Sequence, residues 1–260
     1  MDVLFLCLGS ATDIPEQAAG YARHFTTVDT DDNHQLIPRH RAEMDPAARE
    51  GGHVAMISTG WDPGLFSVNR VLGAALFPQP QQNTFWGKGL SQGHSDAVRR
   101  VPGVRRGVQY TIPSEEAIAE ARAGRGAEIT GASAHVRECY VVADEADHAA
   151  ITTMPDYFAP YETTVHFISE EEFERDHQGM PYVRECHVVT SGDLGGSRSA
   201  VEFVLELEST PDSTAAAQVA YGRAAARPKA LGEMGARTVP EVAPYLLSPT
   251  GLDELIRRDV

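Results

Sequence analysis

The stretch MDVLFLCLGSATD, residues 1–13, decides the fold. Residues 3–9 form an unbroken apolar run that closes on Gly9 and Ser10. Such a run is typical of a parallel strand that is buried on both faces and leads into a ligand loop. Thr12 or Asp13 then caps a helix that has Pro15 in its first turn. The chain thus opens with a strand of the kind found in the middle of a sheet.

The first 80 residues go on alternating between strand and helix patterns. Two more strands are predicted over 26–30 and 53–60, and two more helices over 35–52 and 62–77. We expect the first of these helices to be broken near Pro46, and the second to begin with an Asp62 cap and Pro63 at its first position. This alternation predicts an α/β region with a partial parallel sheet of the Rossmann type.

From about residue 80 the strand patterns become longer and alternate in polarity. Strands are predicted over 107–113, 135–144, 163–169, 186–193 and 200–208. Short acidic helices between them indicate antiparallel strands with one open face, and hence an α+β domain over roughly 80–210. An Ala-rich helix over 213–227 and a tail over 242–260 follow.

Charge and cysteine content limit the partners. The formal net charge of -15 makes nucleic acid an unexpected partner, although a small anionic substrate remains possible. The three cysteines are Cys7, Cys139 and Cys186. Their number and spacing indicate neither a disulfide framework nor a metal site, so we expect no metal. We expect Cys7 to be a small buried apolar residue. No signal peptide or membrane-spanning run is present in these residues, so a cytoplasmic protein without a membrane partner is expected.

Polar clusters follow the three predicted parallel strands. They are Gly9–Thr12, Asp29–Asn33 and Ser58–Asp62. The carboxyl ends of parallel strands line the ligand crevice of a doubly wound sheet, so three clusters together favour a site. Each cluster alone is equally typical of turns and helix caps.

Asp32 and Asp62 are candidates for acid–base chemistry. Two carboxylates that converge on one crevice can hold a substrate ammonium and take its proton. The alternative is that Asp62 is a helix cap before a proline and that Asp32 is a turn residue.

Further candidates lie in the second half. Trp86 stands in a glycine-rich segment, where it forms either a ligand wall or a core anchor. His94-Ser95-Asp96 is only a weak pattern for a nucleophilic triad, because adjacent residues rarely face one another. Arg137 lies inside a strand and needs an anionic partner, which is either a substrate carboxylate or a carboxylate across the strand.

Two octapeptides are nearly the same, HVRECYVV (135–142) and YVRECHVV (182–189). No longer period surrounds them, so they do not indicate a repeat architecture. Chance similarity and a local copying error in the sequence both account for them.

Eight stretches together closely resemble the meso-diaminopimelate dehydrogenase family, over residues 2–260. They are LCLGSATDIPEQ, VDTDDNH, STGWDPGLFS, TFWGKGLSQGHSDAVRR, QYTIPSE, RECYVVAD, MPDYF and EVAPYLLSP. The resemblance implies NADP-dependent oxidative deamination of meso-2,6-diaminopimelate at its D-centre. The product is L-2-amino-6-oxopimelate, within lysine and cell-wall precursor biosynthesis.

The resemblance also implies domain roles. Residues 1–80 would be the remainder of a dinucleotide-binding domain, 81–210 a substrate-binding and dimerisation domain, and 211–260 helices returning to the first domain. A homodimer is expected. The family begins earlier, with a strand, a Gly-x-Gly-x-x-Gly turn and a helix that these residues do not contain, so the chain looks truncated at its N-terminus. The alternative function is an inactive or weakly active truncated relative that binds the amino acid but not NADP.

Site residues follow from the matching motifs. Asp32 and Asp62 would be catalytic at the D-centre, with Trp86 beside them and Gln92 and Asp96 lining the substrate site. Thr111 and Arg137 would bind the distal carboxylate. Residues that would contact the cofactor are Cys7, Leu8, Gly9, Ser10, Thr30, Asp31, Asp32, Thr59, Gly60, Trp61, Asp62 and Pro63. Tyr182 and Thr210 would also bind substrate, although the chain departs from the family at both positions. Tyr182 replaces a histidine and Thr210 an asparagine.

Overall fold

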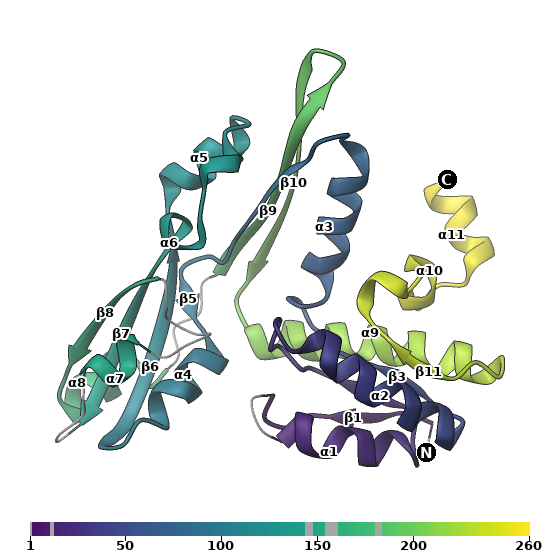
Figure 1. Ribbon diagram of the computed structural model, residues 1–260, viewed down its shortest axis with the longest axis horizontal. Coiled ribbons are helices and arrows are strands. Elements are labelled where there is room, and N and C mark those ends of the chain that lie inside the picture. The colour runs from purple at the N-terminus through teal and green to yellow at the C-terminus, as the bar shows by residue number, and fades with distance from the viewer. Residues whose placement is uncertain (1, 11–12, 144–147, 154–160, 180–183) are drawn as a thin grey trace. The chain divides into compact units, whose positions relative to one another are not determined.

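The computed structural model describes residues 2–10, 13–143, 148–153, 161–179 and 184–260 (Figure 1). The chain divides into two compact units. The first unit comprises Met1–Val71 and Pro211–Val260, and the second comprises Leu72–Thr210. The C-terminal segment therefore belongs to the same unit as the N-terminal segment.

A parallel sheet forms the centre of the first unit. Its strands are β1 (Leu4–Leu6), β2 (Thr27–Asp29), β3 (Val54–Met56) and β11 (Gly235–Arg237), in the spatial order β1-β2-β3-β11. All three neighbouring pairs are parallel, and Val28 of β2 lies between Phe5 of β1 and Met56 of β3. This confirms the parallel α/β sheet that the alternating pattern predicts.

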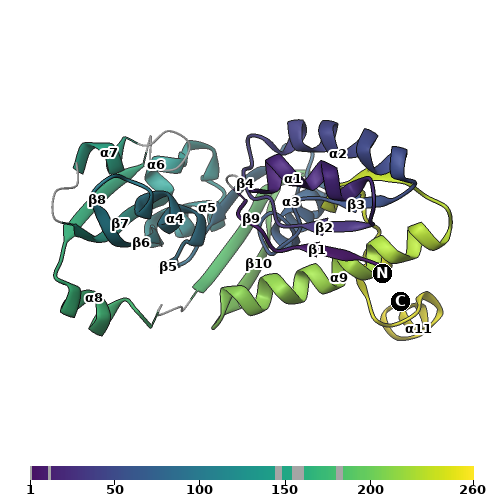
Figure 2. The same ribbon diagram turned by 90° about the horizontal axis from the view of Figure 1, so that it is seen from below.

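Helices cover both faces of this sheet. They are α1 (Asp13–Ala22), α2 (Ile37–Gly51), α3 (Leu65–Leu76), α9 (Thr210–Ala230), η2 (Val239–Glu241) and α10 (Pro244–Leu247). The last helix, α11 (Leu252–Asp259), has no buried residue. The buried residues of α1 and α2 join one apolar core with Leu6 and Ala55, whereas Tyr221 of α9 joins another with Val28 and Val54. Figure 2 shows α1 and α2 on one side of β1–β3 and α9 on the other. Two separate cores, one per face, are the mark of a doubly wound sheet.

Three details of the first unit differ from the sequence predictions. Pro46 lies inside the continuous helix α2, because it is on the solvent side while Met44 and Ala47 anchor the helix to the core. Helix α3 begins at Leu65 and not at Pro63, which follows a cis peptide bond with Asp62. Cys7 is exposed and not buried, because it lies beyond the end of β1.

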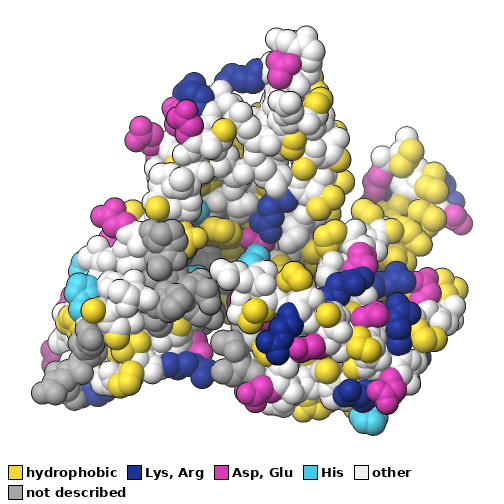
Figure 3. Space-filling view, in the orientation of Figure 1, with side chains coloured by type: hydrophobic (Ala, Val, Ile, Leu, Met, Phe, Trp, Pro, Cys, Tyr) yellow, Lys and Arg dark blue, Asp and Glu magenta, His cyan; other side chains and the backbone are white. Residues whose placement is uncertain are grey.

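Basic and acidic side chains lie close together on the face that Figure 3 shows. Along α2, Arg39 pairs with Glu43 and Arg49 with Asp45, both four residues apart. Solvent screens exposed pairs of this kind, so they stabilise the helix only slightly.

The second unit contains two sheets. The first has the order β10-β9-β4 and consists of β4 (Gln81–Phe85), β9 (Arg184–Leu194) and β10 (Ser197–Leu207). The second has the order β5-β6-β7-β8 and consists of β5 (Gly89–Leu90), β6 (Val104–Pro113), β7 (His135–Ala143) and β8 (Glu162–Phe167). Its helices are α4 (Gln92–Arg99), α5 (Glu115–Arg122), η1 (Gly126–Glu128), α6 (Gly131–Ala134), α7 (His148–Thr152) and α8 (Glu170–Asp176).

Both faces of the β5–β8 sheet are covered by apolar contacts. On one face, Cys139 and Val141 of β7 pack with Val98 of α4 and Ile151 of α7. On the other face, Val108, Tyr110 and Val142 pack with Phe173 of α8. No helix of the described residues is long and apolar enough to cross a membrane.

Most strand pairs in the second unit are antiparallel as predicted, but β8 pairs with β7 in parallel. The connection from Ala143 to Glu162 contains α7 and is long enough for the crossover that parallel strands require. The two similar octapeptides fall on different sheets, in β7 and β9, where Cys139 and Cys186 are both fully buried.

Candidate active site

The structure brings the three predicted polar clusters of the first unit to one edge of its sheet. Parallel β1, β2 and β3 are consecutive neighbours, so the chain leaves them at the same edge near Gly9, Asp29 and Ser58. Residues 11 and 12 of the first cluster lie outside the described residues. This edge is where ligands bind in open α/β sheets.

Asp62 is held by an arginine that sequence reasoning did not identify. Arg70, in the second turn of α3, donates from Nη2 to Oδ1 of Asp62 over 2.5 Å and from Nη1 to Oδ2 over 3.2 Å. The Asp62 side chain is only 1% exposed. This two-point contact fixes the orientation of the carboxylate, so a substrate ammonium would have to share it with Arg70.

Asp32 is exposed, whereas its neighbour Asp31 is buried. Burial raises the pKa of Asp31 to about 6, with Asp29 and Asp32 adding to the effect and His40 opposing it. Asp29 is fully buried and contacts His40, a second residue that sequence reasoning did not identify. The predicted catalytic Asp32 therefore lies on the connection after β2, next to the buried Asp31.

The remaining strand-end residues are partly occupied by contacts within the chain. The Gly9 N–H donates to Oδ2 of Asp13 over 3.2 Å. Thr59 donates both its N–H and its hydroxyl to the carbonyl of Asp29, over 2.9 and 2.8 Å. The ring of Trp61 meets that of Phe66 edge-on at 5.6 Å. These loops are held in place by local bonds.

In the second unit Trp86 is half-buried and lies against a histidine. Its backbone N–H donates to Nε2 of His135 over 2.9 Å, and the ring centroids are 5.1 Å apart. Since Nε2 accepts, the neutral ring carries its proton on Nδ1, which is buried and has no hydrogen-bond partner among the described residues. Burial, with a contribution from the charge of Arg137, lowers the pKa of His135 to about 3.

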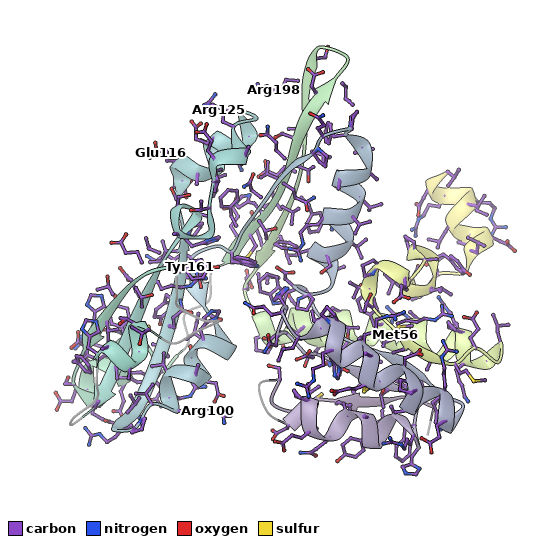
Figure 4. The ribbon with its side chains drawn as sticks, viewed as in Figure 1. Met56, Arg100, Glu116, Arg125, Tyr161 and Arg198 are labelled. Carbon is purple, nitrogen blue, oxygen red and sulfur yellow. The ribbon has the colours of Figure 1, made fainter. Side chains whose placement is uncertain are left out.

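Arg137 is a buried cation next to Thr111. It is 3% exposed, and the strand register places it between Thr111 of β6 and Thr163 of β8. Neither residue directly opposite Arg137 on these two strands is therefore a carboxylate. The Arg137 guanidinium lies over the ring of Tyr161, which Figure 4 labels, at 4.2 Å from Cζ to the centroid.

The guanidinium of Arg137 keeps unused donors. Nε and Nη1 are buried without a hydrogen-bond partner in the part of the chain that the structure describes, and so is Oε1 of the neighbouring Gln109. Burial lowers the pKa of Arg137 to about 10, so the side chain still carries its charge at neutral pH. A buried cation is stabilised by an anionic partner, and a carboxylate is the group that a guanidinium pairs with best.

The other predicted substrate residues are less well defined. The Asp96 carboxylate accepts from Nε of Arg100 over 2.7 Å and is 41% exposed. Gln92 begins α4 and Thr210 begins α9, and Tyr182 lies outside the described residues.

A triad of His94, Ser95 and Asp96 is not supported. The Ser95 hydroxyl is buried and accepts the N–H of Gln109 over 3.0 Å, whereas His94 contacts Oγ of Ser91 over 2.6 Å. Adjacent helical positions send these side chains to different partners. Among the described residues no group of three His, Cys, Asp or Glu side chains could hold a metal ion.

Comparison with known proteins shows which family the chain is similar to. Residues 60–209 match the family model described as the diaminopimelic acid dehydrogenase C-terminal domain. Over its full length the chain is 58% identical to the meso-diaminopimelate D-dehydrogenase of Corynebacterium glutamicum, covering 82% of that protein. It is 49% identical to the Ureibacillus thermosphaericus enzyme of the same name, with 98% of this chain and 79% of the relative aligned.

Two solved structures resemble the whole chain. The C. glutamicum DAP dehydrogenase in complex with DAP superposes with a TM-score of 0.96 at 58% identity. An engineered D-amino acid dehydrogenase bound to NADP+ superposes with a TM-score of 0.94 at 56% identity. In both cases all of this chain and 82% of the other chain are aligned.

Proposed function

Because the chain belongs to the meso-diaminopimelate dehydrogenase family, we propose that it catalyses the NADP-dependent oxidative deamination of meso-2,6-diaminopimelate at the D-centre. The product is L-2-amino-6-oxopimelate. The observation that carries the proposal is Arg137, a buried guanidinium whose Nε and Nη1 have no partner among the described residues. A dicarboxylate substrate supplies the missing anion.

Arg137 and Thr111 bind the distal carboxylate of the substrate. They lie side by side on neighbouring strands, and both are buried. The Thr111 hydroxyl already accepts from Nε2 of Gln109 over 3.2 Å, so its own proton is available for a substrate oxygen. Trp86, which His135 orients, forms an apolar wall for the substrate.

Asp32 and Asp62 act at the reacting centre. The exposed Asp32 can hold the substrate ammonium, and Asp62 takes a proton from the ammonium or from the water that attacks the imine carbon. Ammonia then leaves and the carbonyl forms. Arg70 keeps the Asp62 carboxylate aimed in one direction throughout.

When bound, the nicotinamide cofactor accepts the hydride. The residues proposed to contact it lie at the carboxyl edge of the β1–β3 sheet. The first turn of α1 carries Asp13 and Glu16, and Asp13 occupies the Gly9 N–H. Negative charges at a helix N-terminus disfavour phosphate, so we assign these strand ends to the nicotinamide and ribose part of the cofactor.

We further propose that the first unit binds the dinucleotide and that the second unit binds substrate and forms a homodimer. Val201 and Val204 of β10 are exposed apolar side chains of that second unit, which favours association. The cytoplasm is the proposed location. Gln92, Asp96, Tyr182 and Thr210 keep their predicted roles at the substrate, although Asp96 would have to leave Arg100 to serve.

The test is a stoichiometric assay of the purified protein. Incubation with NADP and meso-diaminopimelate should yield NADPH and ammonia in equal amounts, whereas the LL isomer should yield none because it lacks a D-centre. Absence of NADPH with the meso isomer, together with retained binding of the amino acid, would instead favour a binding module. Equal rates with both isomers would contradict the proposed stereochemistry.

A further inference from the structure

A buried carboxylate joins the two loops that carry Asp32 and Asp62. Asp29 is the last residue of β2 and is fully buried. Its Oδ1 accepts the N–H of Asp31 over 3.1 Å and the N–H of Ser58 over 2.8 Å. Asp31 lies directly before Asp32, and Ser58 opens the loop that leads to Asp62.

The backbone of Asp29 strengthens this connection. Its carbonyl accepts the N–H and the hydroxyl of Thr59, over 2.9 and 2.8 Å. Ser58 has a φ of 55°, in the left-handed region, where a residue with a Cβ is disfavoured. The bond from its N–H to Asp29 helps hold this conformation, so the start of the second loop depends on Asp29.

His40 of α2 completes the network from the other side. Its Nε2 lies 2.9 Å from Oδ2 of Asp29, and its side chain is 6% exposed. A buried carboxylate needs a partner for its charge, and truncating one member of such a pair leaves the other uncompensated. His40 therefore supplies the partner that holds the Asp29 carboxylate in place next to both loops.

We propose that the Asp29–His40 pair is a positioning device that sets the geometry of the two loops carrying Asp32 and Asp62. The inference rests on the proposed function for the importance of those two carboxylates. Neither Asp29 nor His40 needs to contact the substrate, so both are positioning residues.

The charges around His40 make the pair sensitive to pH. The groups that face it are Asp29, Asp31 and Glu43, with Asp32 next to Asp31. Burial by itself lowers the pKa of His40, but the hydrogen bond and charge of Asp29, with Asp31 and Glu43, raise it above its ordinary value. The imidazolium form that binds Asp29 thus persists above pH 6.5, and it is lost as the pH rises further.

The first test is hydrogen exchange in His40→Gln, with His34→Gln as the matched control. His34 is exposed and lies on the same connection between β2 and α2. Amides of residues 30–33 and 58–62 should exchange at least tenfold faster in His40→Gln, while those of β6 should be unchanged. His34→Gln should match the parent. Unchanged exchange in both loops would overturn the proposal.

The second test follows the imidazole and the reaction. Nuclear magnetic resonance should show the His40 ring titrating above 6.5 in the parent and lower in Asp29→Asn; equal values would overturn the proposal. This titration needs only the parent and one variant, so it decides the matter even if His40→Gln does not fold.

The kinetic test uses the same two histidine variants. His40→Gln should lower kcat with diaminopimelate at least tenfold. We expect the parent to lose kcat/KM at alkaline pH as His40 deprotonates, and His40→Gln to lack this decline. A parent without turnover would refute the proposed function alone, since exchange and titration still report on the loops. A variant with parental kcat and an unchanged pH profile would overturn the positioning role.

Discussion

The guanidinium of Arg137 lies face-on above the ring of Tyr161, with Cζ 4.2 Å from the ring centroid. The ring supports the cation without consuming its donors, because a cation–π contact uses the face of the guanidinium rather than its N–H groups. Nε and Nη1 have no hydrogen-bond partner among the described residues, so they are available to an anion that binds beside Thr111. The tyrosine ring therefore holds the arginine in place, while the N–H groups of the arginine bind the anion.

Replacing Arg137 should therefore affect substrate affinity more than cofactor affinity. We expect Arg137→Leu to raise the KM for diaminopimelate by about tenfold to a hundredfold, the range for losing one or two charge-assisted hydrogen bonds. The KM for NADP should change less than about threefold by the same reasoning. Steady-state kinetics with each substrate varied in turn measure both values.

Tyr161→Leu serves as the control for that experiment. It removes the ring but keeps the donors of Arg137, and should cost only about 0.5–2 kcal/mol, the range for a cation–π contact. A larger rise in KM than in Arg137→Leu would show that the tyrosine, and not the arginine, binds the substrate.

His135 should stabilise the protein as a neutral ring. Its folded pKa of about 3 lies below its ordinary value of 6.5, so its contribution is fully present above 6.5 and is lost as the pH falls toward 3. His135→Phe leaves the Trp86 N–H without its acceptor and should cost roughly 1–3 kcal/mol at pH 7. The difference in unfolding free energy between the parent and His135→Phe should shrink by about 2 kcal/mol at pH 5. At that pH only the parent loses stability, because its histidine takes up a proton on unfolding.

Urea unfolding of both proteins at the two pH values measures this difference. His148→Phe, which changes a histidine at the start of α7, is the comparison. A difference in unfolding free energy that stays constant with pH would mean that the pKa of His135 is the same in the folded and the unfolded protein.

The sequence predicts the parallel sheet of the first unit, but the prediction of a first strand buried on both faces in the middle of a sheet is wrong. Strand β1 spans only Leu4–Leu6, lies at the edge of the described sheet and leaves Phe5 38% exposed. The sequence also predicts that Arg137 is buried and that its partner is an anion. It does not predict Arg70 or His40, since a pairing between elements depends on the angle at which a helix crosses a strand. Arg70 had one usable signal: it follows Asp62 by eight residues on an adjoining helix, and long side chains lean toward the helix N-terminus. The parallel pairing of β8 could not be predicted from alternation, which is the same in parallel and antiparallel edge strands.

Asp62 should be needed for the chemical step. Asp62→Asn keeps the shape but cannot take a proton, so kcat should fall by about a hundredfold or more. Arg70→Met should leave Asp62 without its two-point contact and lower kcat by a smaller factor, about tenfold, through misplacement. A rate for Asp62→Asn within about threefold of the parent would rule out its role as base.

Asp31 should destabilise the protein at neutral pH, because it is buried and its pKa is raised from 3.8 to about 6. Below about pH 4 the carboxyl is neutral in both states, so its contribution to stability is fully present there. As the pH rises through 6, the unfolded chain has already ionised, and that contribution is lost.

Asp31→Asn removes the charge and keeps the shape, so it should raise the free energy of unfolding at pH 8 by roughly 2–3 kcal/mol relative to its effect at pH 4. Chemical denaturation at the two pH values measures this difference. An equal effect of Asp31→Asn at both pH values would mean that Asp31 ionises as readily in the folded protein as in the unfolded chain.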